Sequence, residues 1–123
     1  MLTYFISGHL SLSNDEFSRN YARTILTAME GGAYFVVGDA RGCDHLAQKV
    51  LGLLYPHRKV TVYHMLSSPR NLAAPFNVMG GYQSDTERDA AMTAASDKDI
   101  AWVRPGRETS GTAKNLARRL TGA

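Results

Sequence analysis

Short apolar runs alternate along this chain with stretches whose apolar residues recur at a helical period. The apolar, β-prone runs lie at residues 2–7, 33–37, 60–65 and 100–103. Between and after them we expect helices over about residues 14–29, 46–55, 85–95 and 110–120. Strands that alternate with helices predict an α/β fold with a mainly parallel sheet and right-handed crossovers. Ligands bind to such sheets beyond the carboxyl ends of the strands.

The length and composition indicate one ordinary globular domain over residues 1–123. Hydrophobic residues make up 44% and charged residues 20% of the chain, which excludes extended disorder. No apolar run approaches the roughly 20 residues that a membrane-spanning helix requires, and the first residues lack the features of a secretory signal. We therefore expect a cytoplasmic protein without a membrane partner.

Metal binding and redox chemistry are not expected. The single cysteine, Cys43, cannot form an internal disulfide or a thiolate zinc site, and it agrees with a reducing compartment. The four histidines, at positions 9, 45, 57 and 64, show no metal-ligand spacing. We expect no metal and no cofactor.

The segment before the last helix has the composition of a phosphate site. Pro105 and Gly106 form a turn, and Ser110-Gly111-Thr112 begins the helix. The first N–H groups of a helix lack intrahelical acceptors, and the helix dipole adds positive charge there. Five of the fourteen basic residues lie between positions 104 and 119, within a chain of net charge +3. We expect the phosphate to contact Gly106, Ser110, Gly111 and Thr112.

Glycines and polar residues also follow the first two strands, at the same edge of the sheet. Glycine permits close approach of the backbone to a ligand, and aspartate accepts hydrogen bonds from ribose hydroxyls. The alternative is that Asp44 caps the next helix and Arg41 is solvated. The ligand-binding residues that we predict here are Gly8, His9, Gly38, Asp39, Arg41, Gly42 and Asp44.

Two further features belong to the third helix and the connection before it. Arg88 lies in the first turns of a helix, where the dipole does not favour a cation, so we expect a phosphate or carboxylate partner. In a ligand site it would orient the phosphate or the ribose. The alternative is a surface ion pair with Glu87 or Asp89.

Residues 66–83 are too long for a simple link, which indicates a ligand-covering loop or an oligomer contact. Within that connection, Tyr82 is the candidate for base stacking, whereas Trp102 is expected in the core.

Three motifs in this order resemble the SLOG superfamily. They are Gly38-Asp39-Ala40-Arg41-Gly42-Cys43-Asp44, Glu87-Arg88-Asp89-Ala90-Ala91-Met92, and Pro105-Gly106 followed by Ser110-Gly111-Thr112. That group includes the Lonely Guy phosphoribohydrolases, which cleave the N-glycosidic bond of nucleoside monophosphates, the DNA-processing DprA/Smf proteins and several nucleotide-sensing domains. The last motif is also similar to a loop of nucleoside 2-deoxyribosyltransferases. The resemblance implies a Rossmann-like, doubly wound domain that binds a nucleotide or a nucleotide-derived small molecule.

One position departs from the phosphoribohydrolase pattern. In those enzymes an arginine of an Arg-x-x-x-Met segment and a glutamate after the Gly-Thr pair carry catalysis. Arg88 and Met92 match the first segment, but Asn115 stands where the glutamate is expected. Asparagine cannot act as a carboxylate does at an oxocarbenium-like centre. An enzyme would therefore use Arg88 with another acid. Glu108, Glu87, Asp39 and Asp44 lie at or near the expected strand exits, and of these Glu108 and Glu87 are the candidates.

These residues leave three functions open. One is N-glycosidic cleavage of a nucleoside monophosphate, and another is a nucleotide sensor or sequestering protein, which Asn115 favours. The third is binding of single-stranded nucleic acid, as in the DprA/Smf relatives, which the net charge of +3 does not favour. Related domains commonly dimerise, so we expect a homo-oligomer whose interface the sequence does not identify.

Overall fold

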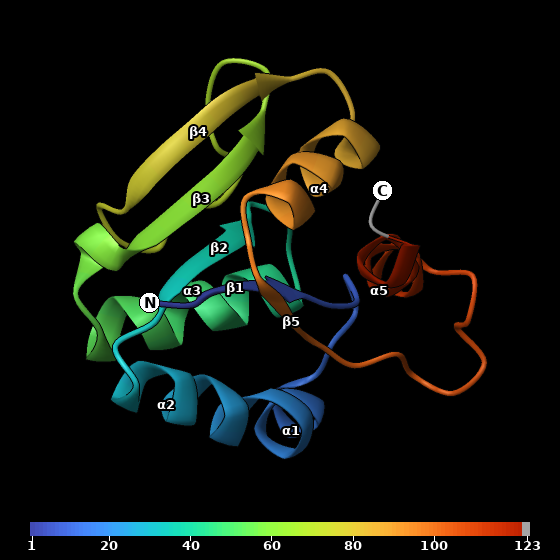
Figure 1. Cartoon of the computed structure of the whole chain (residues 1–123), viewed down its shortest axis with the longest axis horizontal. Helices are drawn as coiled ribbons and strands as arrows, with labels where there is room; N and C mark the ends of the chain where they lie inside the picture. Colours follow the sequence, from blue (N-terminus) through green and yellow to red (C-terminus); the bar gives the residue numbers. More distant parts are fainter. Residues whose placement is uncertain (122–123) are drawn as a thin grey trace.

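Five parallel strands form one sheet in the order β4-β3-β2-β1-β5 (Figure 1). The strands are β1 (Thr3–Ser7), β2 (Tyr34–Gly38), β3 (Val60–Met65), β4 (Asn77–Tyr82) and β5 (Lys98–Ala101). This computed structural model describes residues 1–121. Helices cover both faces of the sheet, which confirms the expected α/β, Rossmann-like doubly wound fold.

The helices form two layers. They are α1 (Asn14–Phe17), the π-helical turn η1 (Ser18–Ala22), α2 (Arg23–Glu30), α3 (Cys43–Leu54), the short 3₁₀ helix η2 (His57–Lys59), α4 (Asp85–Ala94) and α5 (Gly111–Thr121). The helices α1, α2 and α3 lie on one side of the sheet, and α4 and α5 pack against each other on the opposite side (Figure 1). No helix among residues 1–121 is both long and apolar enough to cross a membrane.

The expected helix over residues 14–29 contains a π-helical turn. It begins with a capping box, in which the Ser13 hydroxyl accepts from the Glu16 N–H and the Glu16 carboxylate accepts from the Ser13 N–H. Phe17, Tyr21 and Ile25 are buried at intervals of four residues. A regular α-helix has 3.6 residues per turn, so this stripe would drift around its surface. The wider π turn at residues 18–22 keeps the stripe against the sheet.

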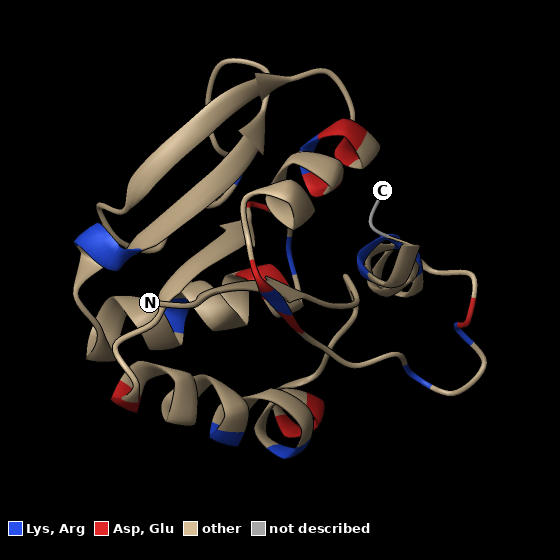
Figure 2. Cartoon of the chain, in the orientation of Figure 1, with Lys and Arg blue, Asp and Glu red and all other residues tan. Residues whose placement is uncertain are grey.

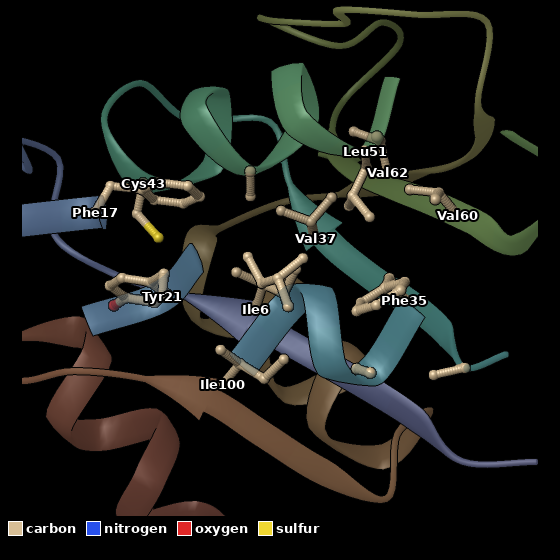
Figure 3. Close-up of a cluster of buried hydrophobic side chains, with 14 of the residues drawn as sticks. Ile6, Phe17, Tyr21, Phe35, Val37, Cys43, Leu51, Val60, Val62 and Ile100 are labelled. Atoms are coloured by element: carbon tan, nitrogen blue, oxygen red, sulfur yellow. The ribbon is translucent and has the colours of Figure 1, made fainter. Parts of the chain in front are cut away.

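The main core lies between the sheet and the α1–α3 layer (Figure 3). Ile6 and Val37, each 0% exposed, reach this layer from β1 and β2, and Leu51 meets them from α3. A smaller cluster on the α4 side contains Phe5, Val36, Tyr63 and Met92. Neighbouring residues of one strand thus enter opposite layers, which explains why these strands appear in the sequence as continuous apolar runs.

The connection over residues 66–83 contains a strand that the sequence pattern did not predict. Strand β4 is exposed along most of its length and includes Gly80 and Gly81. A side chain at position 80 would collide with the imidazole of His64, so glycine allows β4 to lie against β3. Tyr82, the candidate for base stacking, stacks on Tyr63 with 5.9 Å between the ring centroids.

The last strand also begins earlier than expected. Strand β5 starts at Lys98 and ends at Ala101, so Trp102 follows the strand and is partly buried against the main core. The chain runs from β1 through β2 and β3 to β4 on one side, and then returns to place β5 on the other side of β1. This creates a topological switch point between β1 and β5, where ligands of open α/β sheets bind.

Candidate functional site

A pocket of about 250 Å³ lies at this switch point. Its walls come from the segments after β1 and β2, from α4, and from the loop and helix that follow β5. The residues that line it are Phe5, Ser7, Gly8, His9, Leu10, Ala40, Asp44, Arg70, Asp85, Arg88, Asp89, Met92, Arg107, Ser110, Gly111, Thr112 and Asn115. The sheet topology therefore brings together polar residues from distant parts of the chain.

The first turn of α5 presents free backbone donors to the pocket. The Ser110 hydroxyl caps the helix by accepting from the Ala113 N–H at 3.2 Å. The N–H groups of Gly111 and Thr112 have no acceptor among residues 1–121. Both residues line the pocket, and so does the exposed Arg107. Two backbone donors, the helix dipole and one guanidinium thus favour an anion at this wall.

Two buried hydroxyl-bearing residues also line the pocket. Ser7, at the end of β1, is 6% exposed, and its hydroxyl has no hydrogen-bond partner among the described residues. Thr112 is 4% exposed. Buried polar groups are normally satisfied, so an unpaired hydroxyl at a pocket wall indicates a ligand atom or a water molecule as its partner. Sequence reasoning missed Ser7 because it belongs to the apolar strand run.

His9 holds the loop that leads to α5. Its Nε2 accepts a hydrogen bond from the Arg104 N–H at 2.8 Å, and its ring meets the edge of Trp102. Burial lowers the pKa of His9, and the charges of Arg104 and Arg107 lower it further, against the opposing effect of Glu16. The neutral imidazole that this hydrogen bond requires is therefore favoured.

Arg104 anchors the same loop to α1. Its guanidinium pairs with Glu16 at 2.7 Å and also bonds to Ser11. The hydrogen bonds from Arg104 lower the pKa of Glu16 to about 2, with a further contribution from the Ser13 N–H. Figure 2 shows both signs of charge in the loop between β5 and α5 and a concentration of acidic residues on α4. Of the two arginines in this loop, Arg107 lines the pocket and Arg104 does not.

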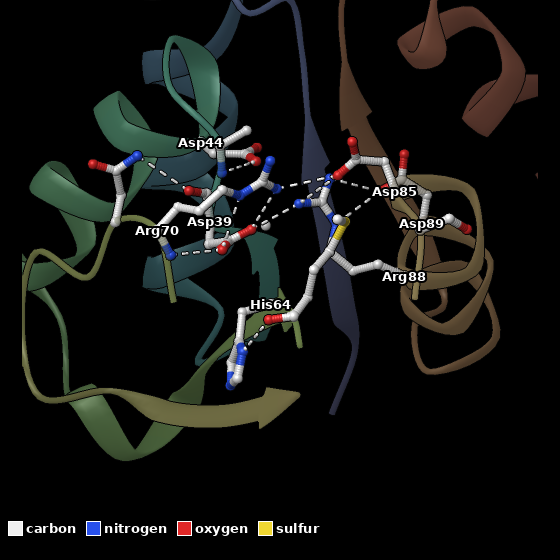
Figure 4. A network of polar contacts seen from close by, with 12 residues as sticks. Asp39, Asp44, His64, Arg70, Asp85, Arg88 and Asp89 are labelled. Carbon is white, nitrogen blue, oxygen red and sulfur yellow. Dashed lines mark hydrogen bonds and ion pairs between the residues drawn. The ribbon is translucent and has the colours of Figure 1, made fainter. Parts of the chain in front are cut away.

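Asp39 is the centre of a polar network behind the pocket (Figure 4). Its side chain is 0% exposed and accepts from the Arg70 N–H, from the Arg70 guanidinium and from the Arg88 guanidinium, each at 2.8 Å. Burial opposes ionisation, but the hydrogen bonds and charges of the two arginines outweigh it and lower the pKa of Asp39. Asp39 does not line the pocket; its hydrogen bonds join the end of β2 to the connection that contains Arg70 and to α4.

Arg88 lies in the pocket wall, as the resemblance implies, but its donors are already paired. Its side chain is 7% exposed and bonds to Asp39 at 2.8 Å and to Asp89 at 3.0 Å, with Asp85 at 3.4 Å. Arg70 bridges Asp39 and Asp85. These contacts bind α4 to the end of β2. A ligand phosphate would have to compete with carboxylates for either guanidinium.

Asn115 lines the pocket where the resemblance places a catalytic glutamate. It is 3% exposed; its amide nitrogen donates to Asp89 at 3.3 Å, and its oxygen accepts from Arg118 at 2.7 Å. A glutamate could not donate to Asp89 and would add a second negative charge beside it. The side chain at position 115 therefore matches its neighbours as an amide.

The two glutamates that were candidates for catalysis do not line the pocket. Glu87 accepts from the Gln83 N–H at 3.0 Å in the cap of α4, and Glu108 accepts from the Gly106 N–H at 2.8 Å in an exposed turn. The carboxylates that do line the pocket are Asp44, Asp85 and Asp89. No group of three or more His, Cys, Asp or Glu side chains within residues 1–121 is arranged to hold a metal ion.

The remaining predicted residues divide into two sets. Gly8, His9, Asp44, Ser110, Gly111 and Thr112 line the pocket, whereas Gly38, Arg41, Gly42 and Gly106 do not. Arg41 is exposed. Gly42 has a positive φ of 72°, and a side chain there would collide with the carbonyls of His9 and Leu10, so both its conformation and its surroundings require glycine. The Cys43 N–H at the start of α3 bonds to the His9 carbonyl, so this donor is not free for a ligand.

Among the residues that the sequence did not single out, Arg70 and Asp85 have the largest part in the network. Arg70 lies in the long connection, where neither periodicity nor a motif indicated a site. Asp85 lies in the first turn of α4, where the helix dipole favours an acid whether or not it has a further role.

Comparison of the chain with models of protein families, with curated proteins and with solved structures gives no match.

Proposed function

We propose that the protein binds a small phosphorylated ligand, a nucleoside monophosphate or a closely derived molecule, in the pocket at the switch point. The observation that carries the proposal is the first turn of α5, where the N–H groups of Gly111 and Thr112 lack acceptors among the described residues. Such a turn is well suited to a phosphate, because its donors and the helix dipole act on the same group.

The neighbouring groups support the same ligand class. The unpaired Ser7 hydroxyl, the buried Thr112 and the exposed Arg107 line the pocket with this turn. The volume of about 250 Å³ is just below the range of roughly 300–1,000 Å³ common for ligand pockets, which favours a mononucleotide over a dinucleotide. The paired state of Arg70 and Arg88 leaves the α5 side as the main anion site.

The proposal is tested by measuring binding of ribo- and deoxyribonucleoside monophosphates to the wild type and to Gly111→Leu by calorimetry. A Cβ at Gly111 meets no atom within 4 Å, so the leucine fits the fold while it occupies the space where the phosphate is expected. Thr109→Leu is the matched control, because Thr109 is exposed two residues earlier and does not line the pocket.

We expect Gly111→Leu to abolish binding and Thr109→Leu to retain it, with both variants showing wild-type unfolding temperatures. A wild type that binds no monophosphate, or a Gly111→Leu variant that binds as well as the wild type, would remove the phosphate assignment.

Cleavage of the N-glycosidic bond is a second candidate, which the carboxylates in the pocket favour. Mass spectrometry of the same incubations detects free base. Release of base that stops in Asp89→Asn, but continues in Glu87→Gln and Glu108→Gln, would establish hydrolysis by a pocket carboxylate. Retention of intact nucleotide would establish a sensor or sequestering protein.

A further inference from the structure

Asp44 is a carboxyl group in the pocket wall without an ion-pair partner among residues 1–121. It lies at the start of α3, is 6% exposed and lines the pocket. Its Oδ2 accepts one hydrogen bond, from the Ala40 N–H at 3.1 Å. A side chain on Gly38 would collide with this carboxyl, so the glycine makes room for Asp44 beside the end of β2.

The charges around Asp44 do not balance. The cluster contains the acids Asp39, Asp44, Asp85 and Asp89 and two guanidiniums, those of Arg70 and Arg88. Every ion pair that these arginines make within residues 1–121 is to one of the other three acids. Asp44 is therefore buried beside negative charge without a cation of its own, a position in which the neutral form of a carboxyl is favoured.

Each neighbouring element contributes to this effect. Together they raise the pKa of Asp44 to about 7, with burial as the largest cause and smaller contributions from the charges of Asp89 on α4 and Asp39 after β2. Arg88 on α4 and the Ala40 N–H oppose the rise. Near neutral pH, a proton on this carboxyl is consequently stable inside the pocket.

We infer that Asp44 presents an O–H donor to the ligand, and that the ligand places a hydrogen-bond acceptor against it, such as a ring nitrogen or a carbonyl oxygen of a base. This inference rests on the proposed function and specifies the side of the ligand away from the phosphate. It reverses the expectation from the sequence, in which Asp44 accepts from ribose hydroxyls. An ionised Asp44 would instead face the acceptor with a lone pair and repel an anionic ligand.

The test compares the affinity of wild type and Asp44→Asn for one nucleoside monophosphate between about pH 5.5 and 8.5. An asparagine keeps an acceptor for Ala40 and a donor for the ligand but does not titrate. The ligand phosphate titrates equally in both measurements, so its effect cancels in the ratio of the two dissociation constants. Asp85→Asn is the control, because it removes an acid from the same pocket that is ion-paired and 60% exposed.

We expect the two dissociation constants to be similar below pH 6. At about pH 8.5 the wild type should bind roughly thirtyfold more weakly than Asp44→Asn, since only its protonated fraction is competent. Asp85→Asn should follow the wild-type pH dependence. Loss of binding in Asp44→Asn at every pH, or parallel curves for wild type and Asp44→Asn, would overturn the inference.

An NMR titration of the carboxyl carbons in the ligand-free protein separates this inference from the proposed function. The signal missing in Asp44→Asn should titrate near pH 7, whereas a midpoint at or below pH 4 would overturn the proton on Asp44. If the wild type binds no monophosphate, the proposed function fails, and the titration still decides whether Asp44 carries the proton.

Discussion

Replacement of Asp39 with alanine should be among the most destabilising single changes at the pocket. The Asp39 carboxylate is 0% exposed and pairs with Arg88, whose side chain is 7% exposed, at 2.8 Å. Removal of one partner of a buried ion pair costs about 3–5 kcal/mol. Arg88 keeps its contacts with Asp85 and Asp89, which places the expected loss at the lower end of that range. Domains of this size unfold at a cost of about 5–15 kcal/mol, so the loss is a large fraction of the total stability.

Urea denaturation of four proteins measures this effect: wild type, Asp39→Ala, Arg88→Met and the double variant. Because the double variant no longer contains the guanidinium that loses its fully buried partner in Asp39→Ala, its loss should be smaller than the sum of the single losses by about 2 kcal/mol. Asp15→Ala is the matched control. Its pair with Arg19 is 2.7 Å long, but the two side chains are 76% and 69% exposed. The control should cost less than about 1 kcal/mol.

Equal losses for Asp39→Ala and Asp15→Ala would refute the reasoning, since Asp39 is buried and bonded to two arginines whereas Asp15 is exposed and paired with Arg19. Strict additivity in the double variant would refute the coupling between Asp39 and Arg88.

Two other predictions concern stability. In the folded protein the pKa of His9 is lowered from its ordinary value of 6.5. The stabilisation that the neutral imidazole provides is therefore complete above pH 6.5, and it is lost as the pH falls through the pKa of the folded state. His9→Phe should therefore cost about 1 kcal/mol at pH 8 and progressively less toward pH 5 in thermal unfolding, and a constant difference would contradict the hydrogen bond to Arg104. Gly38→Ala places a Cβ against the Asp44 carboxyl and 3.1 Å from Arg88 Cζ, and it should cost about 1–3 kcal/mol in urea denaturation. Gly111→Ala, which enters open space, should cost almost nothing, and equal losses for the two glycines would contradict the steric argument.

The fold could be predicted from the sequence because most of its strands are buried on both faces. Residues such as Ile6 and Val37 make continuous apolar runs, and the intervening helical periods then require parallel strands. Strand β4 escaped prediction because it lies at the exposed edge and contains two glycines, one of which is required by His64 and not by a turn.

Only the general location of the candidate site could be predicted from the sequence. The rule that parallel strands end at one edge correctly grouped His9 with Gly111. The partners of individual charges depend on contacts between distant segments: Asp39 and Arg88 are 49 positions apart, and Arg70 reaches Asp39 from a connection without a motif. Local patterns contain no information about such choices, which is why Glu87 and Glu108 were candidates and Asp89 was not.

Trp102, the single tryptophan of the chain, gives the pocket a built-in optical reporter. The centroids of its indole and of the His9 ring are 6.1 Å apart, and its backbone N–H donates to the Tyr21 hydroxyl. A protonated imidazole quenches indole emission, so the fluorescence of the unlabelled protein follows the charge of a residue in the pocket wall. Changes in that emission during a pH titration would therefore report on the pocket wall itself, without an attached dye.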